Sequence, residues 1–184
     1  MMARILGTTM LLLAVIAVPA WAQDERKGDE IFRDVSAAVL TYPQFTVFDN
    51  VGAAVDSGVV TLQGKVTMPF KKNDIERRVA KIPGVTKVVN KIDVLSVSFF
   101  DDDLRYVIAR AIYGNSAFWQ YASMANPPIH IVVERGRVTL TGVVNNEVER
   151  MLARSLASSF GAFSVTSELK TDAEVQAILD RRGH

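Results

Sequence analysis

The sequence predicts an α+β protein made of two tandem αββαβ units, each a three-stranded mixed sheet with two helices on one face. The first observation behind this is an internal repeat. Residues 58–66, Gly-Val-Val-Thr-Leu-Gln-Gly-Lys-Val, return 78 positions later as residues 136–144, Gly-Arg-Val-Thr-Leu-Thr-Gly-Val-Val, with six of nine residues identical. The second is that helical and strand periodicities flank both segments in the same order. A repeat this long indicates a duplicated domain rather than a solenoid unit.

The N-terminal segment 1–22 has the features of a cleaved signal peptide. Arg4 supplies the positive charge, residues 5–18 are apolar, and Ala20-Trp21-Ala22 places small residues before the expected cleavage site. The apolar run is shorter than the roughly 18 to 20 residues of a membrane-spanning helix. The alternative is an uncleaved N-terminal anchor. The main expectation is a secreted, periplasmic chain that starts near Gln23.

Each unit is expected to open with an amphipathic helix. Apolar residues follow helical spacing in both copies: Ile31, Val35, Ala38 and Val39 in the first, and Leu104, Ile108, Ala111 and Ile112 in the second. Acidic residues precede both stripes, at 29–30 and 101–103. Carboxylates at a helix start cap free N–H groups and complement the helix dipole, which is the favoured interpretation of the three aspartates. A cation site is the alternative.

A β-hairpin follows in each unit. Apolar residues alternate along the first strand of each pair: Val51, Ala53 and Val55, then Ile129, Ile131 and Val133. The turns at 56–58 and 134–136 both end in glycine, which accepts the positive φ of a tight turn. The return strands belong to the repeated segments.

A second helix and a last strand complete each unit. The predicted buried stripes are Ile75, Val79 and Ile82 in the first copy, and Val148, Leu152 and Leu156 in the second. Asn73 and Asn145-Asn146 are the expected N-caps. The last strands are expected over 86–94 and 163–171, each parallel to the strand before its helix.

These elements predict domains over 29–95 and 100–172, joined by a short linker. Phe99 and Phe100 are expected to pack between the two units. The tail, 173–184, is expected to form a short helix.

The order of elements and several motifs resemble the BON domain family. The resemblance rests on the acidic first helix, the Gly-x-Val-x-Leu-x-Gly strand, and residues 82–85, Ile-Pro-Gly-Val, followed by 88–92, Val-Val-Asn-Lys-Ile. The second copy departs from this pattern, because residues 160–162 replace the Pro-Gly-Val stretch and Ser167 stands where Asn90 does. The resemblance implies an envelope protein similar to osmotically induced periplasmic proteins. It also implies attachment to phospholipid membranes and no shared catalytic residues.

Composition argues against several other classes. The chain has no cysteine, so disulfides, thiolate metal sites and a lipoprotein anchor are excluded. Without Arg4 the basic and acidic residues balance at 20 each, and nucleic-acid binding normally needs a basic excess. The two histidines, His130 and His184, are far apart in the sequence and suggest no catalytic or zinc site. We therefore expect no enzyme activity, no metal and no cofactor.

Two features are candidate binding sites. Three aromatic residues, Phe118, Trp119 and Tyr121, follow the first helix of the second copy. Exposed aromatic rings favour the membrane interface. The alternative is that Phe118 and Trp119 close the edge of the core.

The second candidate is the basic second helix of the first copy, with Lys71, Lys72, Arg77, Arg78 and Lys81. Each basic residue near an anionic membrane contributes about 1 kcal/mol. The alternative is an ordinary solvated helix face that keeps the domain soluble.

The sequence thus predicts a non-catalytic periplasmic protein that binds anionic phospholipid surfaces in envelope maintenance or a stress response. Other envelope proteins are further expected partners. The alternative function is a protein-interaction or chaperone-like module that does not bind lipid.

Overall fold

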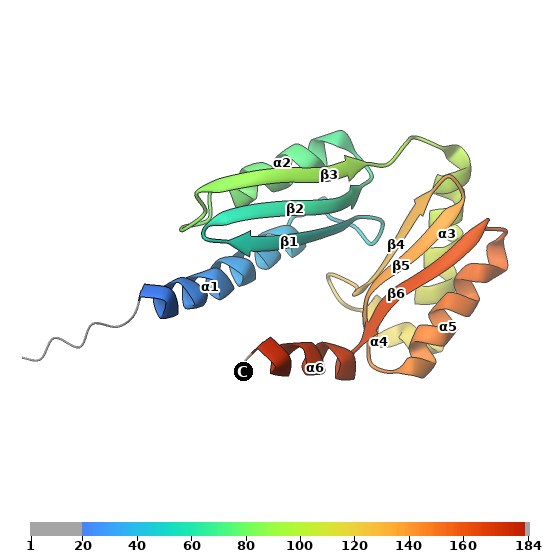
Figure 1. Ribbon diagram of the computed structural model, residues 1–184. Helices are drawn as coiled ribbons and strands as arrows, with labels where there is room; N and C mark the ends of the chain where they lie inside the picture. Colours follow the sequence, from blue (N-terminus) through green and yellow to red (C-terminus); the bar gives the residue numbers. More distant parts are fainter. Residues whose placement is uncertain (1–19, 183–184) are drawn as a thin grey trace, which may run out of the picture.

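The computed structural model describes the backbone of residues 20–182 and the side chains of residues 28–181. The predicted signal peptide, residues 1–22, lies outside the part whose side chains are described, and it stays a prediction. Two three-stranded mixed sheets form two αββαβ units, as the repeat predicts (Figure 1). We call the unit from α1 to β3 domain 1 and the unit from α3 to β6 domain 2.

Domain 1 has the predicted order of elements. They are α1 (Ala20–Leu40), β1 (Asn50–Asp56), β2 (Val59–Val66), α2 (Pro69–Val79) and β3 (Lys87–Val94). Strand β2 is central, antiparallel to β1 and parallel to β3. Both helices cover one face, and their buried residues Ile31, Val35, Ile75 and Val79 meet Val60, Leu62 and Ile92 of the sheet. Helix α2 begins earlier than expected, with Met68 as N-cap and Pro69 in the first turn, so Asn73 is not its cap.

Domain 2 repeats this plan and adds short helices. Its elements are α3 (Phe99–Tyr113), η1 (Ser116–Phe118), α4 (Trp119–Ala122), β4 (Ile129–Glu134), β5 (Arg137–Val144), α5 (Glu147–Ala157), η2 (Ser158–Phe160), β6 (Ser164–Thr171) and α6 (Asp172–Arg182). Strand β5 is central, antiparallel to β4 and parallel to β6. Among the residues described, no helix combines the length and apolar character needed to cross a membrane.

The buried stripe of α5 differs from the prediction at one residue, Val148, whereas Leu152 and Leu156 are half-buried and pack against the core as expected. Asn146 caps the helix as expected, since its side chain accepts a hydrogen bond from the Glu149 amide. Val148, however, is 68% exposed, whereas Ala153 and Ala157 are fully buried. The capped first turn sets the rotation of the helix and places Val148 outward. Small alanines then allow α5 to lie close to the sheet.

Both hairpins close with a two-residue turn of the I′ type. Ser57 and Gly58 have positive φ in domain 1, and so do Arg135 and Gly136 in domain 2. In this turn both central residues are left-handed, which matches the twist of the flanking strands. In domain 2 the buried carboxylate of Asp101 accepts hydrogen bonds from the Arg135 and Gly136 amides, at 2.8 and 2.7 Å. This aspartate therefore holds the turn, in addition to starting α3.

The loop at 41–49, between α1 and β1, joins the two domains. The Ile131 amide at the edge of β4 donates to the carbonyl of Val47 at 2.7 Å. The ring of Phe48 lies edge-on to Tyr106, and the ring of Phe45 lies 5.5 Å from His130. Phe48 also packs against the core of domain 2. The loop thus connects the domains by backbone and aromatic contacts.

The linker does not place its phenylalanines between the domains. Ser98 caps α3 through its side chain, and Phe99 and Phe100 form the first turn. Phe99 is 88% exposed and Phe100 is 52% exposed. The expectation that they pack between the units is wrong, because the loop at 41–49 makes the interdomain contact instead.

Candidate functional site

The predicted aromatic trio is divided between the core and the surface. Phe118 and Tyr121 are buried in the core of domain 2, so they are not available to a membrane or a partner. Trp119 is 73% exposed. The reason is the helical turn of η1 and α4. Phe118 and Tyr121 are three residues apart and share the inward face of this turn, whereas Trp119 points away from it.

Tyr121 is also fixed by hydrogen bonds. Its hydroxyl donates to the Glu149 carboxylate at 2.5 Å and accepts from the Asn145 amide at 2.9 Å. Burial and the neighbouring Glu149 raise the pKa of Tyr121 to about 12. The residue is thus a structural link between the insertion and α5.

The basic residues of α2 are likewise not equivalent. Lys71 is buried, and its ammonium lies 2.6 Å from the carboxylate of Asp49. It is a structural residue and cannot contact a lipid headgroup. Arg78 is half-buried, where it donates to the Ala38 carbonyl at 3.1 Å and lies over the ring of Tyr42.

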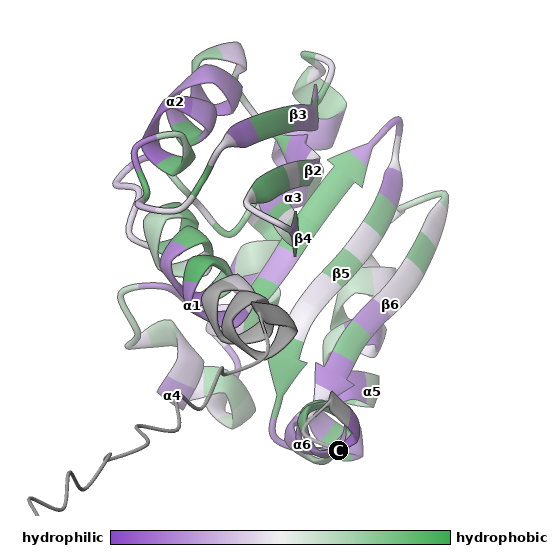
Figure 2. Ribbon diagram, turned by 60° about the vertical axis from the view of Figure 1, so that its left-hand side comes forward, coloured by the Kyte–Doolittle hydropathy of each residue, from purple (hydrophilic) through white to green (hydrophobic). Residues whose placement is uncertain are grey.

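Lys72 and Arg77 on α2, and Lys81 in the turn that follows it, remain accessible. Arg77 forms an ion pair with Asp74 within the helix, and Lys72 and Lys81 make no ion pair in the described part of the chain. Figure 2 shows this helix as largely hydrophilic. Of the five predicted basic residues, these three are therefore the ones that an anionic surface can reach.

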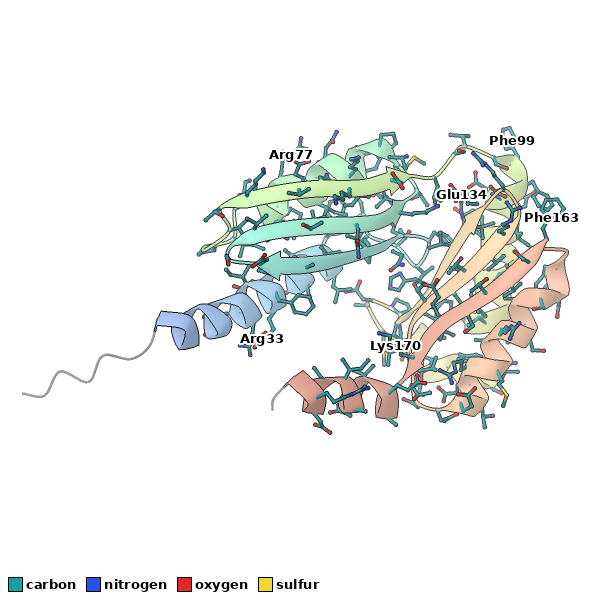
Figure 3. The ribbon with its side chains drawn as sticks, viewed as in Figure 1. Arg33, Arg77, Phe99, Glu134, Phe163 and Lys170 are labelled. Carbon is teal, nitrogen blue, oxygen red and sulfur yellow. The ribbon has the colours of Figure 1, made fainter. Side chains whose placement is uncertain are left out.

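An exposed phenylalanine cluster lies at the end of domain 2 where the linker enters. We call Val97, Phe99, Phe100 and Phe163 the aromatic end patch. Phe163 is 79% exposed, and its ring centre lies 6.3 Å from that of Phe100. Figure 3 shows Phe99 and Phe163 projecting at the same end of the molecule.

The local backbone explains how this patch forms. Phe163 directly precedes β6, and its amide donates to the Gly136 carbonyl at 2.8 Å. A Cβ on Gly136 would press against the rings of Phe163 and Phe100. The start of α3 and the start of β6 therefore meet at the hairpin turn. Their aromatic side chains point outward there.

Sequence reasoning missed this patch, although a signal was present. Ser98 is a good N-cap, which places Phe99 and Phe100 in the first helical turn rather than in a linker. The contribution of Phe163 could not be anticipated, since it depends on how β6 meets the hairpin turn.

Domain 1 adds apolar side chains at its linker end. The linker leaves from the end of β3, and the Leu95 amide donates to the Val66 carbonyl, so it starts beside the end of β2. Met68 and Phe70, which follow β2, are both exposed. Exposed apolar residues thus flank the linker on both domains.

His130 lies at the domain interface rather than in a catalytic arrangement. Its side chain is on the sheet face opposite Ile129 and Ile131, and its Nδ1 is buried with no hydrogen-bond partner. Burial lowers the pKa of His130, although the neighbouring backbone at Asp49 and Thr46 partly opposes this. In the described residues, no three His, Asp or Glu side chains lie together in a way that would hold a metal ion.

Comparison with known proteins identifies the family. The model of the BON domain matches residues 29–96 and 116–176. Among curated proteins, none matches the sequence significantly. Two similar solved structures are described as CdsD, a structural protein of the type III secretion system of Chlamydia trachomatis, and as its C-terminal domain.

Both are 13% identical to this chain. The first alignment covers 83% of this chain and 98% of the other, with a TM-score of 0.30. The second covers 78% and 66%, with a TM-score of 0.31. Scores this low carry no argument about function. The family matches, in contrast, span most of the chain: the first covers domain 1 from within α1 to the end of β3, and the second begins after α3 and covers domain 2 from η1 to β6, with the start of α6. The chain therefore belongs to the BON domain family, and this membership supports an envelope-associated, non-catalytic role.

Proposed function

We propose that this chain is a peripheral protein of the periplasm that binds phospholipid membranes, and that the aromatic end patch makes the contact. The observation that carries the proposal is the exposure of Phe99 and Phe163 at the same end of domain 2, where the ring of Phe100 lies close to that of Phe163. Large exposed apolar groups that lie together mark interaction sites, whereas isolated ones do not.

The apolar area is large enough to matter. Burying a phenylalanine side chain gains about 2 kcal/mol. Phe99 and Phe163 together would contribute about 4 kcal/mol, a partition factor of about a thousand. Phe100 is already half-buried and adds less. This contribution is sufficient for reversible membrane binding but not for permanent insertion.

The basic residues of α2 support the same orientation. Helix α2 starts beside the linker, at Pro69, and carries Lys72 and Arg77 on its accessible side, while Lys81 follows in the turn after the helix. In Figure 3, Arg77 and Phe99 project from the same margin of the molecule. We expect anionic lipids to strengthen binding, by about 1 kcal/mol for each basic residue near the surface.

Trp119 is exposed at the opposite end of domain 2. Helix α3 separates it from the patch, and 15 residues at 1.5 Å each span about 22 Å. A membrane contact centred on the patch at one end of α3 therefore leaves Trp119 outside it. The patch is favoured because it has several aromatic side chains and lies beside α2, whereas Trp119 is a single ring.

Co-sedimentation with vesicles tests the proposal. The chain should pellet with vesicles that contain phosphatidylglycerol, and less with vesicles of phosphatidylcholine alone. The double substitution Phe99→Ser and Phe163→Ser should reduce binding by a hundredfold or more. Val148→Ser, another exposed apolar position, is the matched control and should have no effect.

Absence of pelleting with every vesicle at low salt would refute the proposal. The protein-interaction alternative predicts that result, together with suppression of client aggregation that depends on the same two phenylalanines. We further propose a stress-related role in the envelope, in line with the family resemblance, and deletion of the protein under osmotic stress would test it.

A further inference from the structure

A polar cleft lies between the two domains, with a volume of about 370 Å³. The edge of the domain 1 sheet supplies one wall, with Asn50, Gly64 and Lys65. The outer face of the domain 2 sheet, which its helices leave uncovered, supplies the floor. Figure 3 shows Glu134, one of the floor residues, between the domains.

The strand register arranges this floor in rows across β4, β5 and β6. The row nearest the hairpin turn contains Glu134 and Arg137, and the next contains Val132 and Thr139. Glu168 follows one row further, beside Thr141 on β5. Arg137 and Glu168 therefore stand two rows apart, about 13 Å along the strands.

The first row is positively charged. Lys65 and Glu134 form an ion pair that joins the two domains and neutralise each other. Arg135 and Arg137 also line the cleft, and neither guanidinium has an ion-pair or hydrogen-bond partner among the described residues. Two unpaired arginines, one on each side of Gly136 at the hairpin turn, favour an oxyanion, which accepts paired N–H bonds from guanidinium.

The other end of the cleft offers hydrogen-bond acceptors. Glu168 has no ion-pair partner among the described residues, and Thr139 presents a hydroxyl. The Thr139 hydroxyl and the Glu168 carboxylate both line the cleft, so this end of the floor is suited to a hydroxylated molecule.

We infer that the cleft binds a small polyol phosphate, with Arg135 and Arg137 on the phosphate and Thr139 and Glu168 on the hydroxyl groups. The volume is near the lower end of small-molecule sites, which span about 300–1,000 Å³. The lining is charged rather than apolar. Both points exclude acyl chains from the cleft, although a lipid headgroup and a free metabolite share the phosphate and hydroxyl chemistry.

This site is separate from the aromatic end patch. It includes no residue of the patch, and its binding requires no membrane. The soluble-ligand experiment can therefore fail while vesicle binding succeeds, or the reverse.

Isothermal titration of the whole chain with glycerol 3-phosphate, inorganic phosphate and glycerol tests the inference. We expect saturable binding of glycerol 3-phosphate, weaker binding of inorganic phosphate, and none of glycerol. Arg137→Gln should weaken both phosphate ligands by tenfold or more. Glu168→Gln should weaken glycerol 3-phosphate and leave inorganic phosphate unchanged.

Arg154→Gln is the matched control, because this exposed arginine lies on α5, away from the cleft. It should change neither affinity, and circular dichroism should show all variants folded. The inference would be overturned if neither the soluble phosphates nor phosphatidylglycerol vesicles bound, at low salt, in a way that Arg137→Gln weakens. Equal loss of affinity in Arg137→Gln and Arg154→Gln would also overturn it. Binding of phosphatidylglycerol vesicles that Arg137→Gln weakens, without binding of soluble phosphates, would assign the phosphate to a lipid headgroup.

Discussion

Replacing Asp49 by asparagine is expected to destabilise domain 1 strongly. The carboxylate is fully buried and is the centre of a polar network. It accepts hydrogen bonds from the amides of Thr46 and Thr67 at 2.8 and 2.7 Å, from both of their hydroxyls at 2.9 Å, and from the Lys71 ammonium at 2.6 Å. Asparagine keeps the shape but leaves the Lys71 charge buried without a counter-ion.

The magnitude follows from the burial of both partners. The side chain of Lys71 is only 6% exposed, and leaving one charge of a buried pair alone costs about 3–5 kcal/mol. A small domain is stable by about 5–15 kcal/mol in total, so domain 1 would become marginal. Adding Lys71→Met removes the stranded charge and should restore about 1–2 kcal/mol or more, because apolar replacement of a buried pair is often nearly neutral.

The pH dependence gives a second signature. Burial by itself would raise the pKa of Asp49, but the bonds from Lys71, Thr67 and Thr46 outweigh it and lower the pKa. A carboxyl whose folded pKa is depressed stabilises the fold above its unfolded pKa, and this stability is lost as pH falls through the folded value. The chain with Asp49 should thus lose stability below about pH 4, and the asparagine variant should lack this component.

Hydrogen exchange read by mass spectrometry can measure the effect one domain at a time. Protection of β1, β2 and β3 should fall in Asp49→Asn, while the core of domain 2 stays protected. Asp93→Asn, at an exposed position of β3, is the control and should change stability by no more than about 0.5 kcal/mol. A change below about 1 kcal/mol in Asp49→Asn would refute the assignment of this network as the main polar support of domain 1.

Three further perturbations have defined outcomes. The folded pKa of His130 is lowered from 6.5, so the contact between the loop at 41–49 and domain 2 keeps its full stability above pH 6.5 and loses stability as pH falls. Faster hydrogen exchange of the Ile131 amide in acid should report this loss, and His130→Phe should abolish the pH dependence. Gly142→Ala should destabilise domain 2 by about 2 kcal/mol or more, since φ is 115° and a Cβ would collide with the Pro128 carbonyl. Gly52→Ala, whose Cβ would make only an ordinary contact with the Gln63 carbonyl oxygen at 4.0 Å, should be neutral in thermal melts, and equal effects would contradict the account. Asn146→Ala should cost about 1 kcal/mol through loss of the α5 cap, and an unchanged denaturation midpoint would argue against that cap.

The fold was accessible from the sequence because each unit contains long periodic segments. The stripes through Ile31 and Val35, and through Leu104 and Ile108, are buried as predicted. The duplication also helps, because the prediction of a helix or strand in one copy supports the prediction of the corresponding element in the other copy. The two αββαβ units could therefore be predicted without any comparison.

The candidate sites were harder to predict, because a short segment has too few residues to show the hydrophobic periodicity that reveals which side chains are buried. Whether Phe118 faces inward depends on one turn of 3₁₀ helix, and Lys71 is buried only because Asp49 reaches it from another element. Both are tertiary effects. Phe99 was assigned to the domain interface for a similar reason, since sequence spacing does not reveal that another loop already occupies that interface.

The insertion depth of single tryptophans tests the central claim most directly. We would compare the chain from Gln23, with Trp119 as its only tryptophan, to a variant that carries Trp119→Phe and Phe163→Trp. Both would bind vesicles of phosphatidylglycerol brominated in the acyl chains. Our account predicts strong quenching of the tryptophan at position 163 and little quenching of Trp119. Quenching of Trp119 alone, or of neither tryptophan, would contradict it.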